Sequence, residues 1–366
     1  MLTSVNLSLS SVCGANCIFC PANRGRRIKQ KLMPFEYAEK IINEISSKEF
    51  KKHHNITRIN VGENGDAFLN KDLIRILRLI KLKLPWVRVA IITNFQNFTN
   101  DKIKTILGEK LVDEFGCNID GFNKQNYFNV KKLDLKNTRN NLMNFLRARN
   151  KFNCYPKLYV WAMTLNRYIQ TIRYNFNFYP AKLENHDLVN VSDDFLIIKE
   201  KLEKILDPNI DKICEARAWG WAEREKINTQ NINYKKYSCS RLFVIQTEAF
   251  IAPDGIWYAC CLDSNNELVL GNVIKQSINE IFFSKKRQKL IKLLKNKQFA
   301  KIGGPCKTVN CCQDLSKNRI EAVVIKVMEL KIKLLQRIKR ILKLILPKFA
   351  FSIIFVLFRK IKSIIN

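Results

Sequence analysis

The chain has 366 residues, of which 47% are hydrophobic and 26% are charged, and this composition excludes a globally disordered protein. The net charge of +32 favours either an anionic partner, such as a nucleic acid or a membrane surface, or a surface on which many lysines only solvate the protein. No export signal is predicted at the N-terminus, so the twelve cysteines indicate metal binding in a reducing, cytoplasmic compartment.

Segments with strand and helix patterns alternate along the first half of the chain. Strands are expected at 5–9, 56–61, 87–93, 112–119 and 157–165, with a sixth near 188–191. Helices are expected at 34–47, 72–84, 101–111 and 135–152. Strands that alternate with helices form parallel β/α units with right-handed crossovers. The sequence therefore predicts an α/β protein built on a partial β/α barrel.

Three cysteines, Cys13, Cys17 and Cys20, lie in the loop after the first expected strand. Iron–sulfur clusters are normally held by four cysteines, so a loop with three leaves one iron open to a small molecule. A zinc site is the alternative, because Cys-x2-Cys pairs commonly bind zinc. Zinc sites usually have a second pair of ligands close by, whereas the next candidates are His53 and Cys117. The loop therefore favours an iron–sulfur cluster.

This loop resembles the signature of the radical S-adenosylmethionine (SAM) superfamily. The resemblance of the whole chain to that superfamily extends over roughly residues 3–315. The resemblance implies a partial (β/α)6 barrel and a [4Fe-4S] cluster whose fourth iron is chelated by the amino and carboxylate groups of SAM. Phe19, just before Cys20, matches the position that lies against the adenine. It further implies an enzyme that reductively cleaves SAM to a 5′-deoxyadenosyl radical, which abstracts hydrogen from a substrate. An external one-electron reductant of the flavodoxin or ferredoxin type is implied as a partner.

The same resemblance implies SAM-binding residues at the ends of the following strands, where ligands of such barrels bind. Gly65-Asp66 is similar to the family's glycine–acid motif for the methionine amino group, with Gly62-Glu63 as the alternative register. Thr93-Asn94-Phe95 resembles a Thr-Asn-Gly turn in which Phe95 replaces glycine. The segment 118–121 resembles a Ser-x-Asp-Gly element that reaches the ribose or carboxylate. The implied SAM-binding residues are Phe19, Gly65, Asp66, Asn94, Asn118 and Asp120.

A second group of cysteines lies in the C-terminal third of the chain. Segment 250–258 is typical of two strands joined by an Asp-Gly hairpin, and a helix is expected over 278–294. This order resembles the SPASM/twitch extension of radical SAM enzymes, which holds auxiliary clusters. The ligands expected for one [4Fe-4S] cluster of the shorter twitch form are Cys239, Cys260, Cys306 and Cys311. Cys261 and Cys312 are the alternatives to Cys260 and Cys311, and a structural zinc site could use the same thiols.

The expected domains are a radical SAM barrel at 1–235, an auxiliary-cluster domain at 236–316 and a basic tail at 317–366. From Arg319 onward, apolar residues at helical spacing share the chain with lysine and arginine, which predicts an amphipathic helix interrupted at Pro347. The uncharged stretch 349–358 is too short to span a bilayer. The tail favours peripheral association with an anionic membrane on its cytoplasmic face, and oligomerisation or packing on the barrel are the alternatives.

The substrate is left open among small molecules, peptides and sugars or glycan precursors, and the catalytic residues are unknown. Only twelve residues precede Cys13, so no fused leader-peptide domain is expected, which disfavours autonomous peptide maturation. The auxiliary cluster would assist electron transfer or substrate binding in an oxidation. A radical SAM enzyme that modifies RNA is one alternative, although no RNA-binding module is found and nucleic acid is disfavoured. A non-enzymatic scaffold or electron carrier stabilised by metal is the other.

Overall fold

The computed structural model describes residues 1–17, 20, 31–62, 64–120, 124–164, 195–217, 233–263, 265–308 and 312–314. The chain divides into two compact units, residues 1–313 and 314–366, and the fold reported below is that of the first. Phe19, Glu63, Cys311, the strand expected near 188–191 and the predicted basic tail lie outside the described residues.

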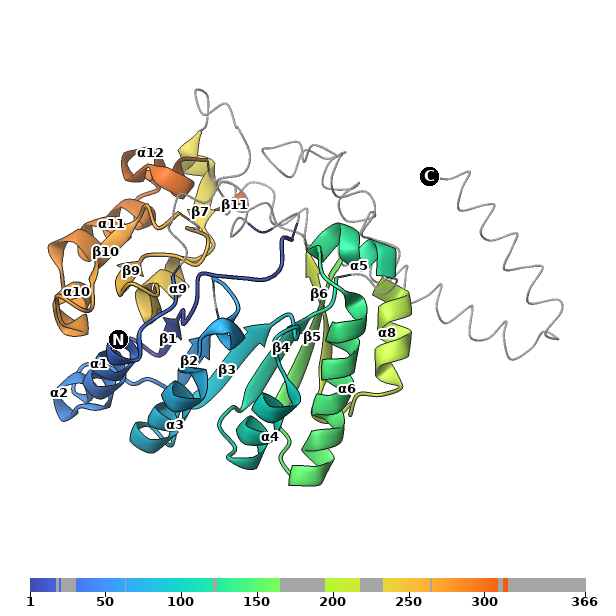
Figure 1. Cartoon of the computed structure of the whole chain (residues 1–366). Helices are drawn as coiled ribbons and strands as arrows, with labels where there is room; N and C mark the ends of the chain where they lie inside the picture. The colour runs from blue at the N-terminus through green and yellow to red at the C-terminus, as the bar shows by residue number, and fades with distance from the viewer. Residues whose placement is uncertain are drawn as a thin grey trace, which may run out of the picture. The chain divides into compact units, whose positions relative to one another are not determined.

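A nine-stranded sheet in the order β10-β9-β8-β1-β2-β3-β4-β5-β6 forms the centre of this unit (Figure 1). Six strands pair in parallel in chain order: β1 (Ser4–Leu7), β2 (Arg58–Val61), β3 (Arg88–Thr93), β4 (Glu114–Asn118), β5 (Lys157–Thr164) and β6 (Lys212–Arg217). Within the described residues the sheet does not close on itself, which confirms the predicted partial barrel. The sixth parallel strand is β6, downstream of the expected position.

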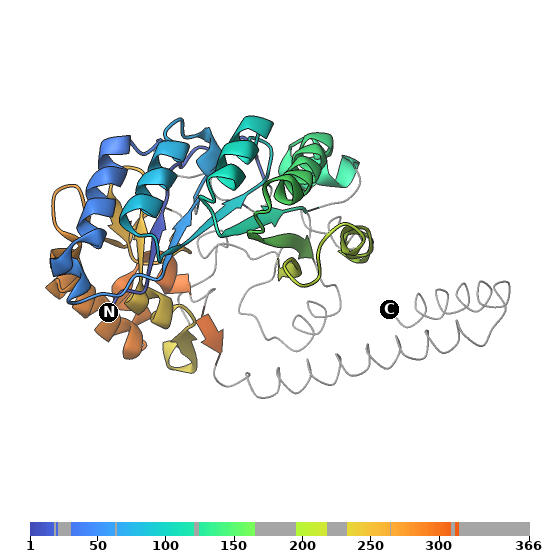
Figure 2. The ribbon, with the colours of Figure 1, turned by 90° about the horizontal axis from the view of Figure 1, so that it is seen from below.

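Helices cover one face of the sheet (Figure 2). They are α1 (Phe35–Ser46), α2 (Lys48–Lys51), α3 (Leu73–Lys83), α4 (Asn100–Gly108), α5 (Lys124–Lys131), α6 (Leu135–Phe152) and α8 (Phe195–Glu203), with a 3-10 turn at Ala67–Leu69. On β3, Val89 and Ile91 are buried, whereas Arg88 and Ile92 are exposed. Val89 and Ile91 thus face the helices, whereas the opposite face carries polar side chains, of which Arg88 is exposed and Asn6 and Glu114 are buried.

The cysteine-rich C-terminal segment continues the same sheet. β8 (Glu248–Ile251) pairs in parallel with β1, and β9 (Ile256–Tyr258) and β10 (Val269–Asn272) follow as antiparallel strands. β8 and β9 form the expected hairpin, at whose turn Gly255 has φ +78° and a Cβ would meet Ile274 at 2.4 Å. The remaining short elements are β7 (Tyr237–Cys239), α9 (Leu242–Thr247), α12 (Phe299–Ile302), β11 (Cys312–Asp314) and 3-10 turns at Tyr234–Lys236 and Gly304–Thr308.

The helix expected over 278–294 is two helices, α10 (Ile278–Phe282) and α11 (Lys285–Lys295). Ser284 separates them, because its backbone is extended and its hydroxyl oxygen accepts a hydrogen bond from the Arg287 backbone N–H at 3.2 Å. A serine side chain that satisfies such an N–H begins a new helix in place of continuing the old one. In the part of the chain that is described, no helix is long and apolar enough to cross a membrane.

His54 connects the N-terminal segment to the C-terminal helices. The side chain is buried, its Nδ1 accepts a hydrogen bond from the Leu2 backbone N–H at 3.3 Å, and its ring centroid lies 4.5 Å from those of Phe50 and Phe282. Burial lowers the pKa of His54 from 6.5 to about 4. The imidazole is therefore neutral in the folded protein at neutral pH.

We expect His54 to make the folded protein sensitive to acid. Between pH 6.5 and about 4 the unfolded chain binds a proton at His54 that the folded protein does not, so the free energy of unfolding falls as the pH is lowered through this window. His54→Gln keeps a hydrogen-bond acceptor and removes the titration. Urea unfolding at pH 7 and at about pH 5 should show a smaller loss of stability in this variant than in the wild type. The exposed His53→Gln is the control, and an equal loss in the wild type and His54→Gln would contradict the prediction.

Candidate active site

The loop that carries the first three cysteines follows β1 at the carboxyl end of the parallel strands. Its backbone is fixed on two sides, because Val12 O accepts a hydrogen bond from the Asp66 N–H at 2.9 Å and the Asn16 N–H donates to Lys131 O at 3.0 Å. Near the C-terminal end of the loop, the Cys20 N–H donates to Cys17 O at 3.1 Å. Contacts from the segment after β2 and from the end of α5 thus hold the loop at the edge of the sheet where barrel ligands bind.

The thiols of Cys13, Cys17 and Cys20 interact electrostatically. Burial raises the pKa of Cys13 to about 11, and the negative charges of Asp66 and of the other two cysteines add to the shift. Burial also raises the pKa of Cys17, against the opposing effect of Lys131. Thiols with raised pKa values carry protons at neutral pH, and a coordinated metal would displace these protons.

The thiol donors of this loop suit an iron–sulfur cluster. Among the described residues, no three Cys, His, Asp or Glu side chains are gathered as direct ligands of one ion. The cysteines that bind a cluster stand further apart, because the iron and sulfide of the cluster occupy the space between them. Three thiols on one loop, of which Cys17 is buried and Cys13 and Cys20 are partly buried, are compatible with that arrangement.

Gly65-Asp66 lies directly against the cysteine loop. A Cβ on Gly65 would lie 2.6 Å from both Ser10 O and Val12 O, so only glycine allows these backbones to approach so closely. In the alternative register, Gly62 has φ +93° and lies at the end of β2, and Glu63 is outside the described residues.

The Asp66 side chain is 1% exposed. Its carboxylate accepts hydrogen bonds from Asn97 Nδ2 at 2.8 Å, from the Phe68 N–H at 3.1 Å and from Thr93 Oγ1 at 3.3 Å. These three donors come from the 3-10 turn after β2, from β3 and from the loop that follows it. They fix the carboxylate at the carboxyl ends of two neighbouring strands, close to Cys13.

The Thr93-Asn94-Phe95 turn also reaches the cysteine loop. Asn94 Nδ2 lies 3.8 Å from Cys13 Sγ, within the range of a weak hydrogen bond to sulfur. Phe95 has φ +63°, the left-handed conformation that favours glycine, which explains the resemblance to a turn with glycine at this position. The ring of Phe95 is fully buried and packs 5.2 Å from that of Phe98 and 5.8 Å from that of Phe145, measured between centroids.

Asp120 makes an ion pair within the protein. Its Oδ2 lies 2.7 Å from Nζ of Lys131, and both side chains are buried. Asn118, the last residue of β4, is partly exposed next to Trp161 of β5. Lys131 does not stand out in the sequence, because one lysine among 64 basic residues carries no distinctive signal beyond its place one helical turn after the buried Tyr127.

The second group of cysteines lies in and around the core of the C-terminal segment. Cys260 and Cys306 are buried, whereas Cys239 and Cys261 are partly buried and pack against the same hydrophobic core. The Leu262 backbone N–H donates to Cys260 Sγ at 3.5 Å. The structure therefore favours Cys260 over Cys261 only by burial, and Cys311 lies outside the described residues.

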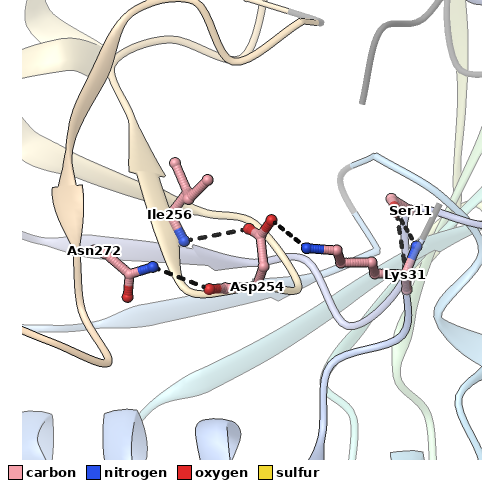
Figure 3. A network of polar contacts seen from close by, with 5 residues as sticks. All are labelled: Ser11, Lys31, Asp254, Ile256 and Asn272. Atoms are coloured by element: carbon pink, nitrogen blue, oxygen red, sulfur yellow. Dashed lines mark hydrogen bonds and ion pairs between the residues drawn. The ribbon is translucent and has the colours of Figure 1, made fainter. Parts of the chain in front are cut away.

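Two polar contacts connect the two cysteine groups. Lys31 follows the cysteine loop, and its Nζ lies 3.1 Å from Asp254 Oδ2 in the β8–β9 turn (Figure 3). The Lys31 backbone N–H donates a hydrogen bond to Ser11 Oγ at 2.8 Å. Asn64, next to Gly65, donates a hydrogen bond to the hydroxyl of Tyr258, two residues before Cys260. The N-terminal loop and the C-terminal hairpin are thus held in a fixed arrangement.

Comparisons with known proteins identify a domain around each of the two cysteine groups. The radical SAM superfamily model matches residues 7–160, and the SPASM model, an iron–sulfur cluster-binding domain, matches residues 239–313. Native anSMEcpe with bound AdoMet (AdoMet being SAM) is 13% identical, with 80% of this chain and 84% of that chain covered and a TM-score of 0.52. BtrN in complex with AdoMet and 2-DOIA is 17% identical, with coverages of 85% and 93% and a TM-score of 0.49. No curated protein matches the sequence, and at these identities the likeness to anSMEcpe shows the fold alone.

Proposed function

Because the chain belongs to the radical SAM superfamily and carries a SPASM iron–sulfur domain, we propose that it abstracts hydrogen from a polar substrate bound on the open face of its sheet. Its cofactors are a [4Fe-4S] cluster with SAM and auxiliary iron–sulfur in the SPASM domain. The observation that carries the proposal is the loop of three cysteines held directly against Gly65-Asp66.

The residues around the loop suggest a division of roles. Cys13, Cys17 and Cys20 would hold three irons of the N-terminal cluster. When bound, the cluster and SAM supply the one-electron cleavage of a sulfonium and thus the oxidising power to remove a hydrogen atom. Gly65 would keep its segment directly against the cysteine loop, and the carboxylate of Asp66 would face the ammonium group of SAM.

The substrate would bind on the sheet face opposite the helices. Near the carboxyl ends of the strands this face carries the exposed side chains of Ile92 on β3 and Trp161 on β5. The partly exposed Asn118 lies on β4, the strand between them. Gly116 lies beneath, where a Cβ would come within 3.1 Å of Ile92 and 3.4 Å of Trp161. An aromatic ring with amide groups nearby suits a polar ring or a peptide segment, so a sugar precursor or a peptide is the proposed substrate class.

The N-terminal half of the same face is polar and supports this assignment. Arg58 pairs with Glu114 at 2.7 Å across the face, and Asn60 Nδ2 donates to Asn6 Oδ1 at 2.7 Å. Asn6 in turn donates to Glu248 of β8 at 2.8 Å. This row, linked by hydrogen bonds and by the Arg58–Glu114 ion pair, would close the bottom of the substrate site and exclude water from it.

The proposal is tested by anaerobic reconstitution with iron and sulfide, followed by measurement of bound iron and of 5′-deoxyadenosine formed from SAM with dithionite. The wild type should bind iron at both sites and release 5′-deoxyadenosine. Cys17→Ala should lose the N-terminal cluster and this product, whereas Cys154→Ala, a buried cysteine between α6 and β5, should keep both. Zinc in place of iron, or 5′-deoxyadenosine formation by Cys17→Ala at the wild-type rate, would reject the proposal.

A further inference from the structure

A buried ion pair lies behind the N-terminal cysteine loop. Lys131 is the last residue of α5 and Asp120 follows the end of β4 by two residues. Their side chains are only 3% and 2% exposed, and the Nζ–Oδ2 distance is 2.7 Å. The loop is attached to the same place, because the backbone carbonyl of Lys131 accepts the hydrogen bond of the Asn16 N–H.

Stability alone is a poor reason for such a pair. Removing two charges from water costs several kcal/mol for each ion, and well-packed apolar residues of similar volume often serve a protein core as well or better. Buried charges with perturbed properties gather preferentially at functional sites. The pair also acts on Cys117 and Tyr127 of the core, but its place beside the loop that carries Cys17 agrees with a functional role.

Lys131 is the member of the pair that contacts the cysteine loop, because the Asn16 N–H, one residue before Cys17, donates to its backbone carbonyl at 3.0 Å. Asp120 holds the Lys131 ammonium through the 2.7 Å contact of its Oδ2. The positive charge of Lys131 also favours the thiolate of Cys17. In a buried environment a charge so close to a redox centre is weakly screened.

We propose that Lys131 is a positioning residue for the N-terminal iron–sulfur cluster, and that its fixed positive charge, held by Asp120, makes this cluster easier to reduce. Reduction adds one negative charge to the cluster, and a nearby cation stabilises that charge. The inference rests on the proposed function, because it needs a cluster on Cys13, Cys17 and Cys20. It concerns how readily the cluster accepts the electron that SAM cleavage requires.

The test is a potentiometric titration of the full-length, reconstituted protein, followed by electron paramagnetic resonance. The signal of the N-terminal cluster is identified by its change on addition of SAM, and the auxiliary signal serves as internal control. In Lys131→Met, the ratio of reduced to oxidised N-terminal cluster at a fixed potential should fall at least about tenfold, a shift of about 59 mV for one electron. Lys131→Arg should restore the wild-type ratio, and the auxiliary cluster should not change.

The Asp120 variants separate charge from structural damage. Asp120→Asn removes the opposing negative charge, so its ratio of reduced to oxidised cluster should rise above the wild-type value. The double variant Lys131→Met/Asp120→Asn leaves no unpaired buried charge and should show a smaller fall than Lys131→Met alone. Two results would overturn the inference for variants that bind as much iron as the wild type. In the first, the reduction potential of the N-terminal cluster is unchanged in all of them, and in the second it shifts in the same direction in all of them. If the wild type assembles no N-terminal cluster, the proposed function itself fails.

Discussion

Gly65→Ala is expected to lower the rate of SAM cleavage by about 10²-fold or more, because a misplacement of reacting groups by about 1 Å has an effect of that size. The added Cβ would lie 2.6 Å from the backbone oxygens of Ser10 and Val12, and neither oxygen can rotate away as a flexible side chain would. The loop that carries Cys13 would have to move. The rate of 5′-deoxyadenosine formation and the Kd for SAM measure the effect.

Gly108→Ala is the matched control. Gly108 ends α4, and a Cβ there would make ordinary van der Waals contact with the ring of Phe152 at 3.5 Å. This variant should keep the wild-type rate and bind SAM normally. Equal rates in Gly65→Ala and the wild type would show that the close approach at Gly65 does not position the cysteine loop.

Phe95→Ala is expected to destabilise the protein by about 3–5 kcal/mol, the usual cost of removing a buried phenylalanine ring. Phe95→Gly removes the same ring but also relieves the left-handed backbone at φ +63°, which costs other residues roughly 1–2 kcal/mol. The glycine variant should therefore be more stable than the alanine variant by about 1 kcal/mol. Urea unfolding midpoints at neutral pH measure both changes.

Phe145 offers the opposite case within the same aromatic cluster. It is fully buried in α6, with its ring centroid 5.8 Å from that of Phe95. In a helix interior glycine costs about 1 kcal/mol more than alanine, so Phe145→Gly should be less stable than Phe145→Ala. The same order of stability at both positions would mean that the Phe95 backbone is not strained.

Local sequence patterns predicted the parts of the fold that depend on neighbours along the chain. The run of apolar residues around Val89 and Ile91 identified β3 as a buried strand, and the helix 135–152 was placed with its observed bounds. The break at Ser284 was missed because the apolar pattern continues through it, and only the hydroxyl of the serine competes with the helix.

The candidate site was predictable where backbone demands fix the residue type. Glycine at 65 and the glycine-like turn at Phe95 both reflect close approach or positive φ, and each stands in the sequence as a local motif. The partnership of Asp120 with Lys131 was not predictable, because it depends on where α5 packs against the end of β4. A carboxylate that looked available to a ligand in the sequence is paired within the fold.

The parallel pairing of β8 with β1 has a consequence for how this protein can be divided. β1 has β2 on one side and β8 on the other, so cutting the chain before the SPASM domain would turn β1 into an open border of the sheet. Val5 and Leu7 are fully buried there, and a bare apolar strand recruits other chains. The two iron–sulfur regions therefore share one sheet, and we expect that neither folds stably when the other is removed.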